Sequence, residues 1–305
     1  MTAQQPISHN ADHQNVEVKP RHMSFPFKRV ENQFFFDNNS LLSTFFASLS
    51  STFPPGEAEF IASVRLYKDQ VTEPNLSEQI RGFIGQEAHH SLQHKRANEV
   101  LRDLGLDAVA LEKKLERDIA EVHKRKGTPK FRLALTVGLE HLTANMAEHV
   151  LNNPEVLDPL EEPIRDLLYW HAVEEIEHKA VAFDVYMQCE GDRKHLRKVL
   201  RMITVLFSVR ITMYMVGMLW QNRTLPNWRD IKGFWRFMIG NKQKPGLLRS
   251  IRKPYMDYFK PDFHPWDHAN EHLITKWKHD LYRADRDKQS EEFVDLEANM
   301  NPATT

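Results

Sequence analysis

The sequence predicts an all-α fold, with one helix following another along the chain. From about residue 40 onward, apolar residues recur at helical spacing, and no segment between turn signals shows the sustained alternation of a strand. The chain has only 11 glycines, too few for an all-β protein full of tight turns. Its 305 residues, 41% of them hydrophobic, are enough to bury a substantial core.

Prolines and glycines mark the limits of the first predicted helices. Residues 40–53 form a short amphipathic stretch that ends at Pro54 and Pro55. The next helix, 55–70, opens with Pro55, a residue well suited to the first helical turn. A longer helix, 77–104, stops at a glycine.

The later helices end in the same way. A charged helix at 107–125 stops at a Gly-Thr-Pro sequence, and the helix at 130–151 is closed by Asn-Asn-Pro. A long helix at 159–188 ends before Gly191, and an apolar helix at 199–221 follows. These boundaries coincide with residues that disfavour helix.

The two ends of the chain are polar. We expect residues 1–30 to be a disordered tail, because they lack any periodicity. Residues 31–190 are predicted to form the bundle core, and residues 191–286 a basic and apolar helical extension of the same domain. Residues 287–305 are expected to be frayed.

Composition excludes several classes of protein. Lys and Arg number 41 and Asp and Glu 42, so a net charge of −1 argues against a protein dominated by attraction to nucleic acid. The single cysteine, Cys189, excludes a disulfide scaffold and a cysteine-based zinc site. The start lacks an apolar signal segment, so we expect a cytoplasmic protein.

Two predicted helices each carry a Glu-x-x-His motif. Glu87 and His90 are three residues apart and share one helix face, and Glu175 and His178 repeat the pattern. His171, four residues before Glu175, joins the second face. One such motif arises by chance on helices rich in Glu and His, whereas two together indicate a metal site.

Two further glutamates lie on apolar helix faces. Glu140 shares its face with residues such as Leu133, and Glu57 continues into a stripe that begins at Phe60. A carboxylate at a core position is costly unless its charge has a partner. Glu59 points to the other side of its helix and is the second choice.

This set of donors is typical of ferritin-like di-iron bundles. Those bundles take a Glu-x-x-His motif from each of two helices and a single glutamate from each of two others. Carboxylates bridge two cations, and imidazoles supply neutral nitrogen ligands that suit iron. We therefore predict a ferritin-like four-helix metal-binding bundle with additional C-terminal helices, holding two iron ions, with manganese or zinc as alternatives.

The same regions resemble a known family. The sequences FPPGE (53–57), FIGQEAHH (83–90), GLEHLTA (138–144) and WHAVEEIEHKAVAFDVY (170–186) look like the bacterial family of predicted metal-dependent hydrolases. The resemblance covers roughly residues 30–270, and it implies metal-dependent hydrolysis.

The ligand pattern is also similar to that of p-aminobenzoate N-oxygenases, which are di-iron enzymes. Their fourth metal-binding helix carries His-x-x-x-Glu-x-x-His, which corresponds here to His171, Glu175 and His178. The similarity implies seven ligands, which are Glu57, Glu87, His90, Glu140, His171, Glu175 and His178.

Three neighbouring residues leave alternatives open. Glu174 competes with Glu175, because it also lies within about 60° of the two histidines of this helix. His94 is interpreted as a buried group that orients ligands, or as an eighth ligand. Thr143, three residues after Glu140, is the candidate catalytic residue and would line an oxygen pocket, with helix packing as the alternative.

The predicted helix at 199–221 is unusually apolar. From Met202 to Trp220 only Arg210 is charged, a length that is enough to cross a bilayer. A central arginine costs about 2.5–3.5 kcal/mol on insertion scales. We therefore favour a fifth helix packed along the bundle.

The surrounding sequence is strongly basic. Residues 195–256 contain 13 Lys and Arg, many aromatic residues and one acidic residue, Asp230. This combination predicts peripheral contact with the inner face of a membrane through residues 195–256. The alternatives are a mouth for an anionic amphipathic substrate and a docking face for the acidic remainder of the chain. Nucleic acid is not expected, because no binding motif accompanies the charge.

Three functions follow from these observations. The first is a di-iron, O2-dependent oxidoreductase of the oxygenase or hydroxylase kind, acting on an apolar or amphipathic small molecule such as a lipid or acyl compound and needing an external electron donor. The alternative is a hydrolase with a dinuclear metal site. The third is a non-catalytic iron-binding or membrane-associated protein, and a homodimer is compatible with all three.

Overall fold

The computed structural model describes residues 16–277, and its regular structure is helical. No strand forms in this range, which contains two isolated β-bridges. The all-α prediction is confirmed, and the arrangement is compatible with a ferritin-like bundle. The helices are α1 (Ser40–Ser50), α2 (Phe53–Arg65), α3 (Pro74–Asp103), α4 (Ala108–Lys126), α5 (Pro129–Asn152), α6 (Glu162–His178), α7 (Val181–Cys189), α8 (Arg193–Gln221), α9 (Trp228–Met238) and α10 (Leu247–Asp257).

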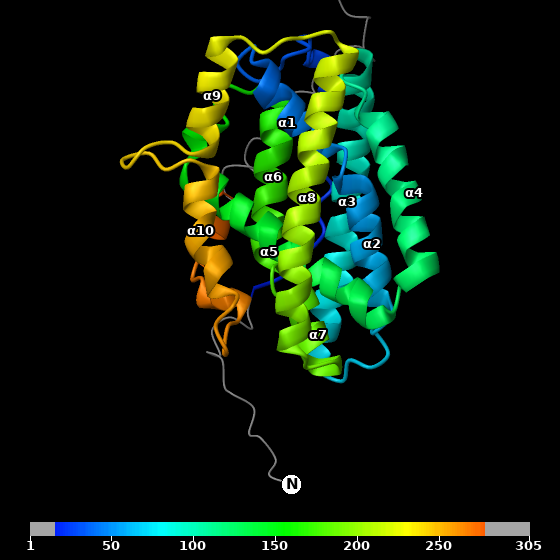
Figure 1. Cartoon of the computed structure of the whole chain (residues 1–305). Coiled ribbons are helices and arrows are strands. Elements are labelled where there is room, and N and C mark those ends of the chain that lie inside the picture. The colour runs from blue at the N-terminus through cyan, green and yellow to red at the C-terminus, as the bar shows by residue number, and fades with distance from the viewer. Residues whose placement is uncertain (1–15, 278–305) are drawn as a thin grey trace, which may run out of the picture.

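Four helices form the core of the bundle and are called the core helices below. Helix α2 packs along α3, and α5 packs along α6, while α2 also contacts α5 and α3 contacts α6 (Figure 1). Each core helix has a proline in its first turn, where the missing N–H is not needed. Side chains of Glu73 and Thr128 accept hydrogen bonds from the first backbone N–H groups of α3 and α5.

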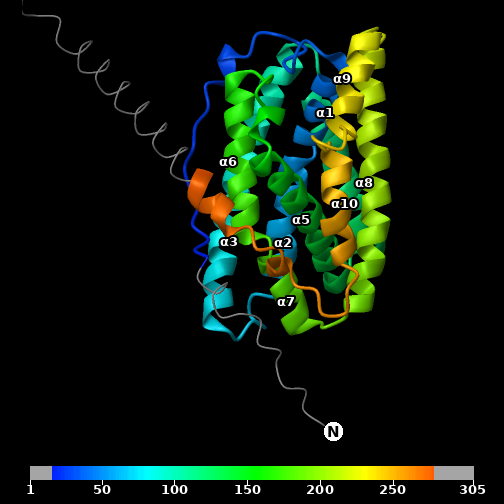
Figure 2. The ribbon, with the colours of Figure 1, turned by 90° about the vertical axis from the view of Figure 1, so that its left-hand side faces the viewer.

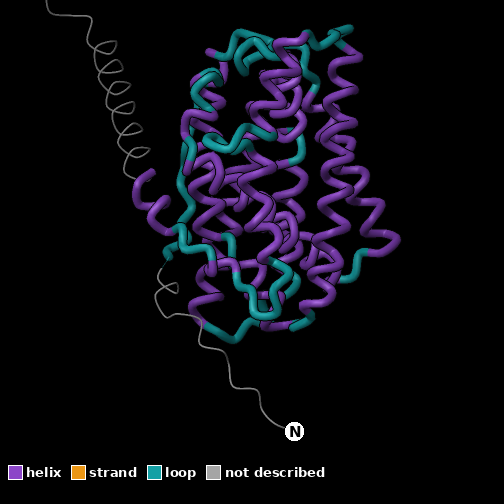
Figure 3. The backbone as a smooth tube through the Cα atoms, turned by 60° about the vertical axis from the view of Figure 1, so that its left-hand side comes forward, coloured by secondary structure: helices purple, strands orange, loops and turns teal. Residues whose placement is uncertain are grey.

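The remaining helices cover the core helices from outside. Helix α4 lies against α2 and α3, and α8 lies against α5 and α1. Helices α9 and α10 pack on α1 and α5 beside α8, so that α8, α9 and α10 occupy one side of the molecule (Figure 2). Most of the connections lie at the two ends of the bundle (Figure 3).

Two apolar clusters leave a polar layer between them. On α3, Phe83 belongs to one cluster and Ala97 to the other. On α5, Val137 belongs to the same cluster as Phe83, and Ala147 belongs to the same cluster as Ala97. The predicted ligands of α3 and α5 fall between these positions, so packing on both sides holds them in the middle of the bundle.

The predicted helix at 159–188 is wrong in one respect, because it is two helices. Helix α6 ends at His178, and α7 begins at Val181. No glycine or proline marks this break in the sequence. The break coincides with Lys179, whose ammonium donates hydrogen bonds to His268 O and Asn270 Oδ1 of the C-terminal segment.

Residues 16–30, expected to belong to a disordered tail, instead form a segment that packs across the bundle, which we call the N-terminal strap. It runs along the outside of α3 and α6 (Figure 2). Backbone contact explains its place, because a Cβ on Gly82 would lie 1.9 Å from Val18 O, and one on Gly85 would lie 2.2 Å from Pro20 Cγ. Residues 1–15, residues 278–286 of the predicted extension, and the predicted frayed tail 287–305 lie outside the described residues.

Candidate metal centre

Eight buried His and Glu side chains meet in the middle of the core helices. Helix α2 supplies Glu57, α3 supplies Glu87, His90 and His94, α5 supplies Glu140, and α6 supplies His171, Glu175 and His178. Helical spacing explains the sets on α3 and α6, since residues three, four and seven apart share one face. The four helices therefore direct their polar faces to one place.

The donor atoms form two groups. In each group, one donor atom of every member lies within 4.8 Å of the others. The first group consists of Glu87, His90, Glu175 and His178. The second group consists of Glu57, His94 and His171.

Short contacts join the two groups and add Glu140. His171 Nε2 lies 2.8 Å from Glu175 Oε1 of the first group and 3.8 Å from Glu57 Oε1 of its own group. His178 Nδ1 lies 3.1 Å from Glu140 Oε2. The structure thus brings all seven predicted ligands together, and their role as ligands stays a prediction.

Several of these buried donor atoms make no hydrogen bond among the described residues. They are both carboxylate oxygens of Glu57 and Glu87, Oε1 of Glu140, Nδ1 of His90 and Nε2 of His178. Buried polar atoms are nearly always hydrogen-bonded, whereas these make only longer ion-pair contacts, such as the 3.3 Å between His178 Nε2 and Glu87 Oε1. Cations placed among these atoms would satisfy them, so the residues fit a metal centre.

The pKa values of the chain by itself reflect this crowding. Burial raises the pKa of Glu57 and Glu87 well above the usual carboxyl value, and neighbouring carboxylates raise it further. Burial and the charge of Glu175 raise the pKa of Glu140 to about 7. Burial alone would lower the pKa of His178, but the charge of Glu140 and its hydrogen bond raise it to about 9. Positive charge brought by metal ions would relieve the repulsion between the carboxylates.

The structure distinguishes the competing glutamates. Glu174 does not belong to either donor group: its Oε2 lies 3.0 Å from His90 Nε2, and its Oε1 accepts hydrogen bonds from Arg21 and Trp170. Glu59 pairs with Arg132 at 2.7 Å, outside the donor groups. Glu175 is therefore the glutamate of α6 that faces the other donors.

Sequence reasoning missed Arg21, which lies in the N-terminal strap. Its guanidinium donates to Glu174 at 2.9 Å and to both oxygens of Glu177 at 2.6 Å. Gln86 also donates to Glu177, at 2.7 Å. The available signal was the run of three glutamates at 174, 175 and 177, since a buried helix with three carboxylates needs a cation nearby.

His94 is the second residue that the sequence left undecided. Its Nε2 lies 2.8 Å from His171 Nδ1, and its Nδ1 lies 3.0 Å from Ser50 Oγ of α1. Ser50 in turn donates to Asn98 Oδ1 at 2.7 Å. His94 therefore both belongs to a donor group and ties that group to α1.

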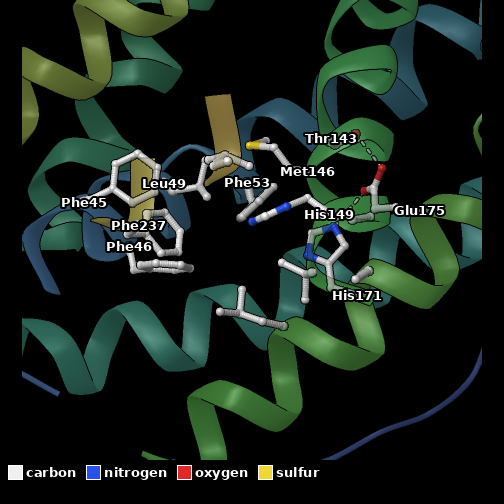
Figure 4. A pocket seen from close by; sticks show the side chains of 15 residues that line it. Phe45, Phe46, Leu49, Phe53, Thr143, Met146, His149, His171, Glu175 and Phe237 are labelled. Carbon is white, nitrogen blue, oxygen red and sulfur yellow. Dashed lines mark hydrogen bonds and ion pairs between the residues drawn. The ribbon is translucent and has the colours of Figure 1, made fainter. Parts of the chain in front are cut away.

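Thr143 lies at the edge of the donor groups. Its hydroxyl donates to Glu175 Oε2 at 2.5 Å, and Figure 4 shows the two side chains facing each other. Thr143 also lines two cavities, together with Phe53 and Met146. This position agrees with the lining of a pocket, and a catalytic role for Thr143 stays a prediction.

The two cavities are mostly apolar. The smaller one, about 70 Å³, is lined by phenylalanines of α1 and α9 and reaches His171 and Glu175 (Figure 4). The larger one, about 330 Å³, lies among α2, α4, α5 and α8 and reaches Glu57. The smaller cavity therefore leads from apolar side chains to both donor groups, and the larger cavity leads to the second group.

Comparison with known proteins places the chain in a family. The model of the family described as predicted metal-dependent hydrolase matches residues 19–269. The chain belongs to this family. No curated protein and no solved structure matches it. The similarity to the ligand pattern of the N-oxygenases has no support from these comparisons and stays a prediction.

Proposed function

We propose that this family member is a hydrolase with a dinuclear metal site, in which the seven predicted ligands and His94 hold two divalent cations. The observation that supports it best is the set of buried donor atoms without hydrogen bonds, found in a chain of the predicted metal-dependent hydrolase family. Two bound cations would supply Lewis-acid activation of water and of a carbonyl or phosphoryl oxygen of the substrate.

The chain's own residues have separate tasks in this proposal. The Thr143 hydroxyl orients the carboxylate of Glu175 and is the group of α5 placed to touch a substrate that enters either cavity. Glu174, held by Arg21, orients the imidazole of His90. The aromatic and aliphatic cavity walls bind the apolar part of the substrate and exclude water from it.

A second candidate function is an O2-dependent di-iron oxidoreductase. The observation that favours it is the donor set, with a Glu-x-x-His motif on α3 and on α6 and single glutamates on α2 and α5, as in ferritin-like di-iron bundles. This function would use two iron ions, O2 and an external electron donor. A non-catalytic iron-binding protein would share the ligands but turn over no substrate.

One experiment separates these functions. Metal-free protein is titrated anaerobically with Fe(II) and then mixed with O2 while its absorption is followed, and the zinc and manganese forms are assayed with esters of increasing acyl length. We expect two metal ions per chain and ester hydrolysis without O2. Two iron ions with a transient coloured species and no hydrolysis would favour the oxidoreductase, and two metal ions with neither reaction would favour the non-catalytic protein.

Variants test the ligands themselves. Glu87→Ala and His178→Ala should each lose stoichiometric metal, because each removes a donor of the first group. The matched control is Glu78→Ala, an exposed glutamate on the same helix α3, which should bind metal as the unchanged chain does. Retention of two metal ions in both ligand variants would overturn the assignment.

A further inference from the structure

Helix α8 exposes an apolar stripe along its outer face. Val205, Val209, Met213, Val216 and Trp220 are all more than half exposed, and Trp220 is 84% exposed. Their spacing of three or four residues places them on one face over about 22 Å. A monomer rarely leaves so long an apolar stripe facing water unless something covers it.

The polar groups on the outside of α8 do not need water as a partner. The hydroxyls of Ser208 and Thr212 are exposed, but each donates to the backbone carbonyl four residues earlier, at 2.8 and 2.9 Å. Such bonds are the usual way for Ser and Thr to satisfy their donors on an apolar helix. The stripe can therefore enter an apolar environment without losing hydrogen bonds from these two residues.

Helices α9 and α10 extend this surface with tryptophans and cations. Trp228 and Trp235 of α9 are 76% and 64% exposed. Arg236 on α9, and Arg252 and Lys253 on α10, are exposed as well. Tryptophan and basic residues together are typical of helices that lie in the interface of an anionic bilayer.

The charge of this region favours a membrane over a second copy of the chain as the partner that covers the apolar stripe. Residues 195–256 carry 13 basic residues and one acidic residue, a net charge of +12. Arg210, Arg229 and Lys244 pair with acidic residues of other segments, but the excess of basic residues is large enough that a two-fold dimer through this face would bring like charges together. An anionic lipid surface has the complementary charge and also accepts the apolar stripe.

The larger cavity opens toward this surface. Met202 and Leu206 are exposed on α8 and also line the cavity, whose inner end is lined by Glu57 of the metal centre and by Thr143. An acyl chain that enters beside Met202 and Leu206 would therefore meet apolar walls as far as the predicted ligands.

We propose that α8, α9 and α10 dock on an anionic bilayer surface and that the larger cavity takes the acyl chain of an amphipathic substrate from it. The substrate assignment rests on the proposed hydrolase function, whereas the docking surface does not. Helix α8 is long and apolar enough to cross a membrane by length and composition, with 22% of its most apolar stretch buried. We infer that it lies on the membrane, because its other face packs on α1 and α5, and Arg210 pairs with Asp118 of α4 at 2.7 Å.

Vesicle sedimentation with the full chain tests the docking surface. We expect partitioning into vesicles of phosphatidylglycerol and phosphatidylcholine to exceed that into pure phosphatidylcholine by about tenfold or more, and to fall as salt is raised. The double variant Val209→Glu/Met213→Glu should lose about tenfold in partitioning, because it places two charges in the stripe. Leu92→Glu, at an exposed leucine of α3, is the matched control and should bind like the unchanged chain.

Three results would overturn the docking surface. They are equal partitioning into neutral and anionic vesicles, concentration-dependent dimerisation without vesicle binding, and binding to duplex DNA in preference to vesicles. If the variant in the apolar stripe fails to fold, the charge variant Arg236→Glu/Arg252→Glu provides a second test. It should also reduce partitioning into the anionic vesicles.

Fluorescent fatty-acid binding tests the cavity. Leu139→Trp fills part of the cavity wall and should weaken binding about tenfold or more, whereas Leu92→Glu should not. Unchanged binding in Leu139→Trp would overturn the acyl-chain assignment. Both measurements require neither metal nor turnover, so their failure is distinguishable from failure of the proposed hydrolase.

Discussion

Arg21 shows how one residue outside the core helices contacts the candidate metal centre through a second side chain. Its guanidinium forms ion pairs with Glu174 and Glu177, and all three side chains are largely buried. Glu174 in turn contacts His90. Burial raises the pKa of Glu174 to about 7, although Arg21 opposes the shift. Arg21 is therefore a positioning residue, which holds the carboxyl group of Glu174 against His90 and opposes the rise of its pKa.

Replacing Arg21 tests this role. Arg21→Gln should lower the free energy of unfolding by about 3 kcal/mol, because it leaves buried carboxylates without their cation. It should also weaken metal binding by about tenfold to 100-fold, because His90 loses its orientation. Denaturant unfolding and metal titration measure the two effects. Arg21→Lys should be intermediate, and the exposed Arg29→Gln should change neither quantity.

Protonation of His178 should make metal binding depend on pH. With its pKa raised to about 9, His178 is protonated at pH 7.5 and must lose that proton before its ring nitrogen binds a cation. We therefore expect metal binding to release protons from His178 and from Glu57 and Glu87, whose pKa values are also raised, and the affinity to rise with pH up to about pH 9. Calorimetry in two buffers of different ionisation enthalpy measures the release.

The metal-free Glu140→Gln variant tests the cause of the raised pKa. Because the Glu140 charge and its hydrogen bond raise the pKa of His178, their removal should lower that pKa, which NMR titration of the metal-free protein measures. An unchanged pKa of His178 in this variant, or an affinity for metal that is independent of pH in the unchanged chain, would contradict the assignment.

At the scale of elements, the N-terminal strap is held by two glycines of α3. Gly82 and Gly85 allow Val18 and Pro20 to lie directly on the helix backbone, and this contact brings Arg21 to α6. Glycine in a helix interior costs about 1 kcal/mol relative to alanine. The close packing of the strap explains why glycine occurs at these two positions of α3 despite this cost.

Alanine at Gly82 should therefore destabilise the protein, whereas alanine in place of a glycine in an open part of a helix should not. Gly82→Ala should lower the free energy of unfolding by about 1–3 kcal/mol, because the new Cβ would overlap Val18 O. Gly217→Ala on α8, where a Cβ meets no atom within 4 Å, should leave the stability unchanged or raise it by up to about 1 kcal/mol. Chemical denaturation of both variants gives the comparison, and a gain in stability for Gly82→Ala would show that the strap does not pack there.

At the scale of the whole molecule, the core is divided by its polar layer. The two apolar clusters lie on either side of the donor groups. The layer itself contains buried carboxylates whose raised pKa values express the unfavourable energy of their charged forms. Metal ions should consequently stabilise the entire bundle, in addition to any role they have in the chemistry of the site.

Removal of metal should lower the thermal stability. A ligand present at 100 times its Kd stabilises the folded state by about 2.7 kcal/mol. For a domain of this size that corresponds to a Tm higher by about 5–10 °C. Calorimetry with and without a chelator measures the shift. Glu87→Ala should abolish it and Glu78→Ala should keep it, and an equal Tm with and without metal would contradict a metal-stabilised core.

Most helices between residues 40 and 221 and the helix faces that carry the candidate ligands could be predicted from the sequence, because both depend on local spacing. Residues three or four apart share a helix face wherever the helix lies, so Glu87 with His90 and Glu175 with His178 were recognisable in isolation. Only tertiary contacts decided that Glu174 turns to Arg21, that α6 ends at His178 and that the larger cavity reaches the surface at α8. Each of these depends on contacts between segments far apart in the sequence. Helical periodicity shows which residues share a helix face, but it does not indicate which segment that face will contact.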